Sequence, residues 1–339
     1  MGSADRDAGG RPTLEAVARH AGVSRGTVSR VINDSPRVSE RARAAVAAAI
    51  EELGYVPNRA ARMLVTRRTD TVALIVSESQ DRLFAEPFFA GVLRGVTAAL
   101  GDTEVQLLLA MAQSAAERAR LRRYLSGQHV DGVMVLSSHA DDPLPGELTA
   151  AGVPLVFGGR PATGGFYVDA DNRDGARQAV AHLVAAGRRR IATIAGPPDM
   201  SPGVDRLRGY RDALAAAGLD ADDTLVATGD FSEDSGQAAM RTLLDRRPDL
   251  DAVFAASDPM ALGAVRRLRA HGARVPADVA VVGFDDSETG RHTDPPLTSV
   301  HQPLSELGAR MAEMLLSRIA GAAPEPVILP TRLVVRVSG

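Results

Sequence analysis

Beyond Thr69 the sequence alternates between short apolar runs and longer amphipathic stretches, and this alternation restricts the fold more than any other feature. Eight apolar runs have the length of buried strands: Val72–Val76, Val105–Leu109, Val130–Leu136, Val153–Phe157, Ile191–Ala195, Thr224–Ala227, Ala252–Ala256 and Val279–Phe284. Segments with helical periodicity lie between them, including Phe88–Leu100, Arg173–Ala186 and Asp234–Asp245. This repetition predicts an α/β fold with doubly wound parallel sheets, and about 270 residues of it fit two lobes better than one.

Residues 11–57 follow a different pattern, that of three short helices with their caps. Thr13, Ser24 and Ser39 are good N-cap residues, and Gly54 stands where a helix commonly ends. We therefore expect helices over Leu14–His20, from Ser24 to about Asn33, and from Ser39 to Leu53. The apolar residues at helical spacing are enough for a small three-helix core: Leu14, Val17, Val23, Val28, Val31, Val46 and Ile50.

The first two of these helices, joined by Ala21-Gly22-Val23, predict a helix-turn-helix, which places the start of its second helix in the major groove of DNA. Arg25 and Arg30 can pair with guanine, and Gly26 lets a base edge come close, so these three are the candidate base readers. The alternative is that the two arginines only solvate an exposed helix face. The residues suited to phosphate contacts are Ser24, Thr27, Ser29 and Asn33.

The charge of the chain is divided unevenly along its length. Residues 1–68 contain 12 Arg against 7 Asp and Glu, a formal charge of +5, whereas the remainder contains 27 Arg against 35 acids, a formal charge of −8. The net charge of −3 therefore hides a basic N-terminal segment on an acidic body. This asymmetry favours a polyanion as the partner of the first segment.

The composition excludes several kinds of catalysis. The sequence has no cysteine, and all 39 basic residues are arginine, so thiol nucleophiles, Schiff-base lysines and phosphate-loop lysines are absent. The segment Gly22-Val23-Ser24-Arg25-Gly26 matches the nucleophile elbow of serine hydrolases, but that elbow follows a strand, and helices are expected on both sides here. The seven histidines show no metal-ligand spacing. We expect no catalytic residues, no metal and no cofactor.

Three segments together resemble the lactose-repressor/galactose-repressor (LacI/GalR) family of transcriptional regulators: Thr13–Ala18, Val28–Asn33 and Gly54–Asn58. The similarity extends over nearly the whole chain from Thr13. It implies a ligand-responsive repressor of genes for sugar or related small-molecule metabolism, which binds a pseudo-palindromic operator in double-stranded DNA as a homodimer. It also implies that Arg25, Gly26 and Arg30 read bases, and that a bound effector either releases the operator or promotes its binding.

The resemblance further implies a hinge helix and linker over residues 58–68, with the helix from Asn58 to Val65 and with Asn58, Ala61 and Leu64 at the minor groove. Leu64 would wedge open the central base step, and the cost of unstacking would be offset by a kinked duplex that meets more protein. A helix of about eight residues is too short to be stable alone, so we expect it to order only against DNA and a second copy. Alternatively, Leu64 is a linker residue packed on the body.

Ligands of open α/β sheets bind beyond the carboxyl ends of the strands. The side chains that follow the expected strands are aromatic, basic, acidic and hydroxyl groups, which suit a sugar, a sugar derivative or a nucleoside-like molecule. The residues of this candidate effector site are Phe88, Phe89, Arg206, Phe231, Ser257 and Asp285, and the resemblance also indicates all of them except Phe88. Phe84 precedes them in the same aromatic segment. Arg206 and Asp285 could alternatively form an ion pair that closes the lobes.

Two positions depart from the pattern of the family. Ser257 replaces the commoner Asn, which removes an amide donor and acceptor, and Gly158-Gly159 stand where an acid is often found, with Arg160 next to them. These departures weaken the case for a simple hexose and favour an unusual sugar or a negatively charged effector.

The expected domains are a disordered tail over residues 1–10, the helix-turn-helix domain over 11–57, the hinge over 58–68 and an effector-binding and dimerisation domain over 69–339. Within the last, the N-lobe covers about 69–168 and 299–325, and the C-lobe about 169–298 and 326–339. No apolar run reaches the roughly 18 residues that span a bilayer, and residues 1–10 lack the apolar core of a signal peptide. We expect a cytoplasmic, nucleoid-associated protein without a membrane partner. The alternative is the body of an exported sugar-binding protein with no regulatory role.

Overall fold

The chain divides into two units, which we call the head (Met1–Thr69) and the body (Asp70–Gly339). The computed structural model describes residues 12–32, 35–56, 68–111 and 114–339. Asn33 of the predicted phosphate contacts, and the hinge residues Asn58, Ala61 and Leu64, lie outside the described residues. None of the helices in the described ranges is long and apolar enough to cross a membrane.

The described residues of the head form three helices: α1 (Leu14–His20), α2 (Arg25–Ile32) and α3 (Glu40–Leu53). Their ends follow the caps that the sequence predicts, since the Thr13 and Ser39 side chains accept hydrogen bonds from the first turns of α1 and α3. Gly54 ends α3 with φ 59°, a left-handed conformation that glycine adopts without strain. The predicted apolar residues pack into one cluster centred on Val17, Val28 and Val46, and the expectation of a small helical head is confirmed.

The first sheet of the body, in the N-lobe, has six parallel strands in the order β11-β5-β4-β3-β1-β2. Their bounds are β1 (Thr71–Val76), β2 (Gln106–Met111), β3 (Gly132–Leu136), β4 (Leu155–Gly158), β5 (Tyr167–Ala170) and β11 (Val327–Leu329). Because β1 lies between β3 and β2, the strand order reverses there, and a crevice opens at the carboxyl ends of the strands.

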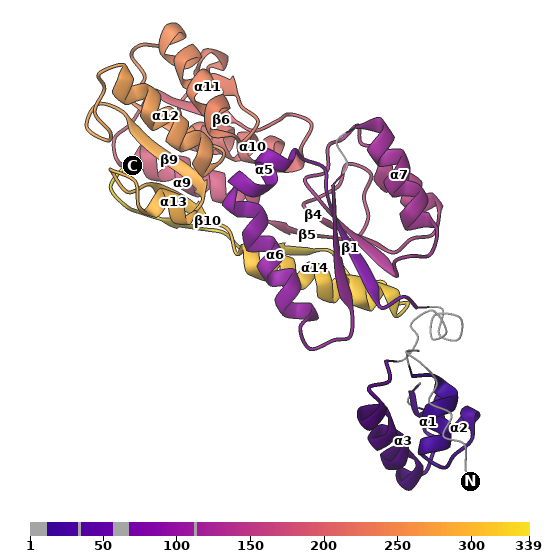
Figure 1. The fold of residues 1–339 in the computed structure, drawn as a ribbon. Helices are drawn as coiled ribbons and strands as arrows, with labels where there is room; N and C mark the ends of the chain where they lie inside the picture. Colours follow the sequence, from indigo (N-terminus) through magenta and orange to yellow (C-terminus); the bar gives the residue numbers. More distant parts are fainter. Residues whose placement is uncertain (1–11, 33–34, 57–67, 112–113) are drawn as a thin grey trace, which may run out of the picture. The chain divides into compact units, whose positions relative to one another are not determined.

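Helices cover both faces of this sheet (Figure 1). Their bounds are α5 (Gln80–Ala85), α6 (Pro87–Leu100), α7 (Ala115–Ser126), α8 (Leu144–Ala150) and α14 (Leu304–Ile319). Alternate residues of β1 point to opposite faces, so Val72 and Leu74 pack with α6 and α14, whereas Ala73 and Ile75 pack with α7 and α8. Both faces of the central strand are therefore buried, which explains its continuous apolar run.

The second sheet, in the C-lobe, has the order β12-β10-β9-β8-β6-β7, and only β12 runs antiparallel to its neighbour. Its strands are β6 (Ile191–Ala195), β7 (Val226–Thr228), β8 (Ala252–Ala255), β9 (Ala280–Asp285), β10 (Thr298–His301) and β12 (Arg332–Val334). Its α-helices are α9 (Asn172–Ala185), α10 (Ser201–Ala216), α11 (Glu233–Arg246), α12 (Asp258–Ala270) and α13 (Glu288–Arg291). Helices α9 and α10 cover one face, and α11 and α12 cover the other, which confirms the predicted α/β class.

The chain crosses between the lobes after β5, after β10 and between β11 and β12. Strand β5 thus belongs to the N-lobe and β10 to the C-lobe, while β11 returns to the N-lobe before β12 joins the C-lobe. The crossings lie close to residues 171, 302 and 330, a few residues later than the expected boundaries at 168, 298 and 325. The difference arises because the sequence pattern did not predict these four short strands.

Candidate functional site: a DNA-reading helix and an effector cavity

The second helix of the head presents the predicted base readers to solvent. Arg25, Gly26 and Arg30 are exposed, whereas Val28, between them in sequence, is fully buried in the head core. Arg25 pairs with Glu15 of α1 across 3.0 Å, and both side chains are about half exposed or more. An exposed ion pair of this kind is weak, so the arginine can exchange its carboxylate for a base or phosphate.

Ser24 caps α2, and this accounts for its position in the turn. Its Oγ accepts a hydrogen bond from the Thr27 amide at 3.1 Å and lies 2.9 Å from the Thr27 hydroxyl. Ser24 stands between the helices α1 and α2, so the strand that a hydrolase elbow requires is replaced by a helix. Both Ser24 and Thr27 lie at the exposed start of α2, where a phosphate would meet them.

A cavity of about 540 Å³ lies in the body, lined from both lobes. The N-lobe contributes residues that follow β3 and β4 and the first turn of α6, and the C-lobe contributes residues that follow β6, β7, β8 and β9. The carboxyl ends of both sheets therefore meet at this cavity. All six predicted effector residues line it: Phe88, Phe89, Arg206, Phe231, Ser257 and Asp285.

Arg206 of α10 is almost fully buried at the base of the cavity and is held on several sides. Its Nε donates to Asn172 at 2.9 Å, and its Nη1 donates to the Ala256 carbonyl at 2.5 Å. Its guanidinium stacks 3.7 Å from the centre of the Phe284 ring. Burial lowers the pKa of Arg206 from its usual value, but arginine remains a cation, so the site has a fixed positive charge.

Asp285 ends β9 and supplies the opposite charge, with its Oδ1 3.8 Å from Arg206 Nη1. Gln302 donates to the same carboxylate at 2.6 Å. Burial raises the pKa of Asp285 to about 6, although the arginine opposes this effect. Arg206 and Asp285 both belong to the C-lobe, so their ion pair does not close the lobes, and that alternative from the sequence is wrong.

The aromatic residues contribute unequally to the cavity. Phe88 and Phe89 meet edge to face with ring centres 5.2 Å apart, and Phe89 is also part of the N-lobe core. Phe231 faces them from the C-lobe, 5.7 Å below the Arg206 guanidinium carbon. Phe84 is 82% exposed and does not line the cavity. Sugar rings stack well on such faces, so Phe88 and Phe231 are the stronger candidates for ligand contact.

Both departures from the family pattern lie in the lining of the cavity. The Ser257 hydroxyl donates to the Phe231 carbonyl at 3.0 Å and accepts from the Met260 amide at 3.3 Å, so it fixes the cavity wall. A Cβ on Gly158 would approach the Leu136 side chain to 2.5 Å and the Met311 side chain to 2.8 Å, so a larger residue there requires these two side chains to shift. Arg160, two residues later, forms an ion pair with Asp205 of the C-lobe.

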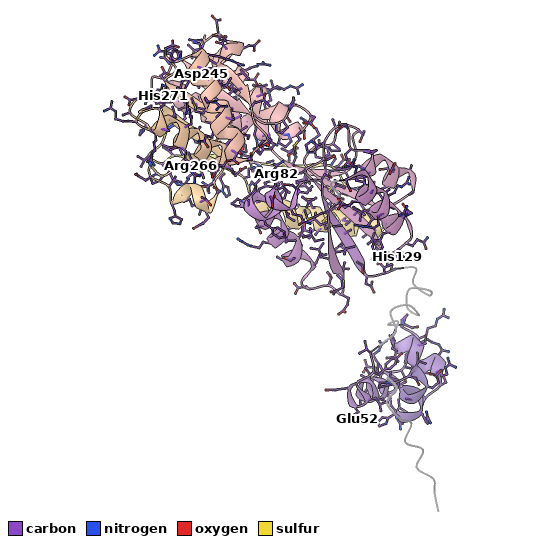
Figure 2. All side chains as sticks on the ribbon, turned by 45° about the horizontal axis from the view of Figure 1, so that its top comes forward. Glu52, Arg82, His129, Asp245, Arg266 and His271 are labelled. Atoms are coloured by element: carbon purple, nitrogen blue, oxygen red, sulfur yellow. The ribbon has the colours of Figure 1, made fainter. Side chains whose placement is uncertain are left out.

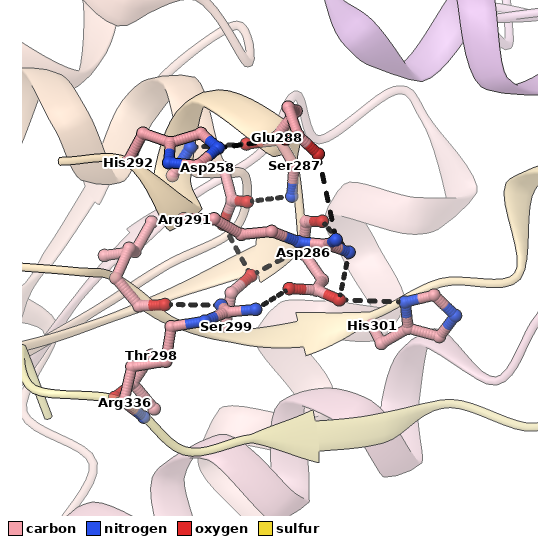
Figure 3. Close-up of polar contacts among 12 residues, drawn as sticks. Asp258, Asp286, Ser287, Glu288, Arg291, His292, Thr298, Ser299, His301 and Arg336 are labelled. Atoms are coloured by element: carbon pink, nitrogen blue, oxygen red, sulfur yellow. Dashed lines mark hydrogen bonds and ion pairs between the residues drawn. The ribbon is translucent and has the colours of Figure 1, made fainter.

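A charged network adjoins the same cavity (Figure 3). Asp286 is buried and accepts hydrogen bonds from Arg336 at 2.5 Å and Arg291 at 2.9 Å, and it lies 3.1 Å from His301 Nδ1. Burial alone would raise the pKa of Asp286, but the two arginines outweigh it and lower that pKa. Arg291 and His301 line the cavity, so Asp286 holds a guanidinium and an imidazole beside it.

Arg82 and Glu86 bring charge from the N-lobe side. Arg82 lies where the two lobes meet (Figure 2) and donates to Glu86 at 2.7 Å and to Glu78 at 2.6 Å. Burial raises the pKa of Glu86 to about 7, against the effect of the arginine. This cavity wall therefore offers a hydrogen-bonding carboxyl group whose charge depends on its surroundings.

Sequence reasoning missed several lining residues. Ser137 and Ser138 directly follow the predicted strand Val130–Leu136, so the carboxyl-end rule could have found them. Arg82 lies on a short helix, and Gln302 follows the unpredicted β10, so no pattern in the sequence indicated either of them.

Comparison with known families gives two matches, one in each unit. Residues 13–58 match the model described as "Bacterial regulatory proteins, lacI family", and residues 180–338 match "Periplasmic binding protein-like domain". The transcriptional regulator CelR of Thermobifida fusca is 61% identical over 335 residues, which cover 97% of this chain and 98% of the relative. The chain belongs to the LacI family.

Other LacI-family members show the same extent of similarity. The ribose operon repressor of Escherichia coli K12 is 37% identical over 95% of this chain and 96% of its own. Among solved structures, a CelR–cellobiose complex aligns with a TM-score of 0.78 at 59% identity, covering 97% of this chain and 100% of that one. A lac repressor dimer bound to operator and the anti-inducer ONPF aligns with a TM-score of 0.83 at 30% identity, covering 97% and 99%. The chain is thus a ligand-responsive, DNA-binding transcriptional regulator, and these relatives are regulators too.

Proposed function

We propose that this LacI-family chain is a homodimeric repressor of sugar-use genes whose effector is a β-linked glucose disaccharide such as cellobiose. The cavity of about 540 Å³ carries this proposal, because it joins aromatic faces to a fixed arginine and several carboxyl groups. Stacking on Phe88 and Phe231 suits the apolar faces of sugar rings, and charged groups bind hydroxyls through short hydrogen bonds. The strong identity to CelR, and the cellobiose bound to a relative with 59% identity, support this sugar class.

On DNA, two heads would bind the half-sites of a pseudo-palindromic operator. Arg25, Gly26 and Arg30 would contact base edges, and the phosphate contacts would come from Ser24, Thr27, Ser29 and Asn33. The excess of arginine over acids in residues 1–68 supports this partner. Asn58, Ala61 and Leu64 would complete the interface at the minor groove, where Leu64→Ala would weaken specific binding more than non-specific binding.

The switch would operate through closure of the lobes. An effector that contacts Arg206 and Asp285 in one lobe and Phe88 in the other binds best when both lobes are close to it. Closure would then change the separation of the two hinges in the dimer and the stability of the hinge helices. The protein would act by binding rather than by catalysis, in the cytoplasm where operator DNA lies.

Operator binding with and without sugar tests the proposal. Palindromic DNA enriched from a random pool by the full chain serves as the probe, and fluorescence anisotropy gives its affinity with cellobiose, glucose or ribose added. We expect cellobiose to weaken binding by tenfold or more, because a repressor of sugar-use genes must release DNA when the sugar is present, and we expect glucose and ribose to have little effect. An equal response to all three sugars, or a response to ribose alone, would contradict the proposed effector.

A further inference from the structure

The loop after β3 carries a contact between the lobes that the effector site does not explain. His139 of this N-lobe loop places its Nδ1 2.6 Å from Oδ2 of Asp199, which lies between β6 and α10 of the C-lobe. The amide of Ala140 donates to the carbonyl of the same aspartate at 3.0 Å. Ser137 and Ser138 of this loop line the cavity, so one short segment both bounds the cavity and reaches the opposite lobe.

The other ring nitrogen of His139 faces a second carboxylate. Its Nε2 lies 3.6 Å from Oε1 of Glu78, which is 6% exposed and belongs to the N-lobe. A neutral imidazole can donate from only one nitrogen, so its other nitrogen would present a lone pair to a carboxylate. The imidazolium form donates from both, and this geometry therefore favours the charged form of His139.

The remaining charges around His139 are mainly acidic. Asp141 and Asp142 lie on the same loop, and the Ser77 hydroxyl donates to Asp142 at 3.0 Å. Arg82 places a cation beside this group, because it binds the other oxygen of Glu78 at 2.6 Å. Burial lowers the pKa of His139, but the hydrogen bond and charge of Asp199, with the charges of Glu78 and Asp141, outweigh it and raise that pKa.

A second ion pair joins the lobes from the next loop. Arg160 follows β4 and pairs with Asp205 of α10, and the backbone amide of Arg160 is held by Asp169 at 3.2 Å. Arginine keeps its charge at every physiological pH, so this pair joins the lobes independently of pH. Of these two contacts between the lobes, the one made by His139 is the one whose charge can change with pH.

We propose that protonated His139 is a latch that joins Glu78 of the N-lobe to Asp199 of the C-lobe and makes the proton a co-effector. Effector binding and proton binding both favour the closed lobes, so each strengthens the other. Below the pKa of His139 the latch is formed. As the pH rises through that pKa, the imidazole loses its proton and with it the ion pair to Glu78, and effector affinity falls. One proton can change the affinity by at most about tenfold per pH unit.

The affinity of the full chain for cellobiose between pH 5.5 and 8.5 tests the latch, which in this form rests on the proposed function. Isothermal titration in two buffers with different ionisation enthalpies also counts the protons taken up. We expect affinity to fall as the pH rises, with proton uptake at neutral pH, and we expect His139→Gln to reduce both. The pH dependence that remains in this variant belongs to the cavity carboxyl groups of Asp285 and Glu86. A His139→Gln variant that keeps the wild-type profile overturns the proposal, as does a flat wild-type profile.

His129→Gln is the matched control. His129 stacks on Tyr124 with ring centres 4.7 Å apart and lies at the end of the N-lobe remote from the lobe boundary that Arg82 marks (Figure 2). This variant removes one N-lobe histidine without touching the latch. It should retain the wild-type pH profile, and loss of the profile here would assign the pH dependence to a general effect of histidine removal.

A second experiment needs no effector and separates failure of the latch from failure of the sugar assignment. The chain has no cysteine, so Arg123→Cys in the N-lobe and Asp245→Cys in the C-lobe accept one spin label each. Electron–electron distance measurement should give one short lobe separation at pH 6 and a broader, longer distribution at pH 8.5. Asp199→Asn should broaden the distribution at both pH values. A distribution that does not change with pH overturns the latch even if cellobiose binds, and a pH-dependent one supports it even if cellobiose does not.

Discussion

Gly26 is the exposed position on α2 where the backbone itself can approach a base edge. A Cβ added there would lie 3.6 Å from the Arg30 side chain and 3.8 Å from Ser24 Oγ, which is ordinary contact. The head therefore tolerates a side chain at this position. Glycine at this position therefore leaves room on the exposed surface of α2, and the packing of the head core does not require it.

Gly26→Ala should make the head more stable and the complex with DNA weaker. Alanine favours a helix over glycine by about 1 kcal/mol, so hydrogen exchange of the α2 amides should slow. The added methyl fills the space for a base edge, so operator affinity measured by anisotropy should fall at least tenfold. Gly54→Ala is the contrast, because φ 59° makes alanine cost about 1 kcal/mol there while the surface of α2 stays unchanged. Unchanged operator affinity in Gly26→Ala would remove glycine from the reading set.

Arg206→Lys should lose effector binding although the charge is kept. A single ammonium cannot reach Asn172 and the Ala256 carbonyl while it also stacks on Phe284, so the buried acceptors lose partners. We expect cellobiose affinity, measured calorimetrically, to fall about 100-fold, or about 3 kcal/mol. Arg211→Lys, at an exposed ion pair on the same helix, should have no effect. Equal losses in the two variants would indicate a general weakening of α10.

The sequence located Arg206 and Asp285 because both follow predicted strands, and the carboxyl-end rule needs only the strand pattern. The expected boundaries already placed both residues in the C-lobe, but nothing local in the sequence indicates that α10 and β9 bring the two side chains into contact. The role of Ser257 could not be predicted either, because its hydroxyl donates a hydrogen bond to a carbonyl 26 residues away in the sequence. Long-range contacts of this kind have no signature in local periodicity.

Among elements, the strands missed by periodicity are those formed where the chain crosses between lobes. Tyr167–Ala170 and Val327–Leu329 have only four and three residues, and their pairing with each other spans more than 150 positions. Thr298–His301 contains polar residues that its sheet buries, such as Ser299, which donates to Asp258. The strands between helices were predictable because each belongs to a repeated local βα unit. The strands at the lobe crossings belong to no such repeat, so periodicity does not indicate them.

Helices α6 and α14 meet through glycines, and this contact supports one wall of the cavity. A Cβ on Gly95 would lie 1.8 Å from the Ser305 carbonyl, and one on Gly308 would lie 2.0 Å from that of Val92. Gly91, Leu304 and Ser305 of the same pair line the cavity. The close approach of the two backbones therefore fixes the N-lobe side of the effector site.

Gly95→Ala should push α6 and α14 apart. Overpacking against backbone cannot relax through a side chain, so we expect a loss of about 3 kcal/mol in the free energy of unfolding, measured with urea. Gly146→Ala on α8 is the control, because its Cβ would meet nothing within 4 Å and alanine favours the helix. If the two variants unfold at the same urea concentration, the helix contact is looser than its geometry indicates.

For the whole molecule, the division at Thr69 predicts that operator binding and effector binding reside in separate units. A fragment of residues 70–339 contains both complete sheets and the cavity, so it should bind cellobiose with the affinity of the full chain. It lacks the head, so its affinity for the operator should fall to the non-specific level in anisotropy at physiological salt. Specific operator binding by this fragment would contradict the assignment of sequence reading to the head.

The crossings of the chain between the two lobes also determine the order in which the lobes can fold during translation. Strand β5 is synthesised well before β11, its neighbour in the N-lobe sheet. Val168 of β5 pairs with Val327 of β11, which lies 159 residues later in the chain. At ordinary elongation rates the gap is on the order of ten seconds. Throughout that time β5 has an unpaired edge, and α14, one of the helices that cover the sheet, is made only near the end of the interval. The N-lobe therefore cannot mature before the C-lobe has been synthesised, and a nascent chain acquires both halves of its effector site together, near the end of its synthesis.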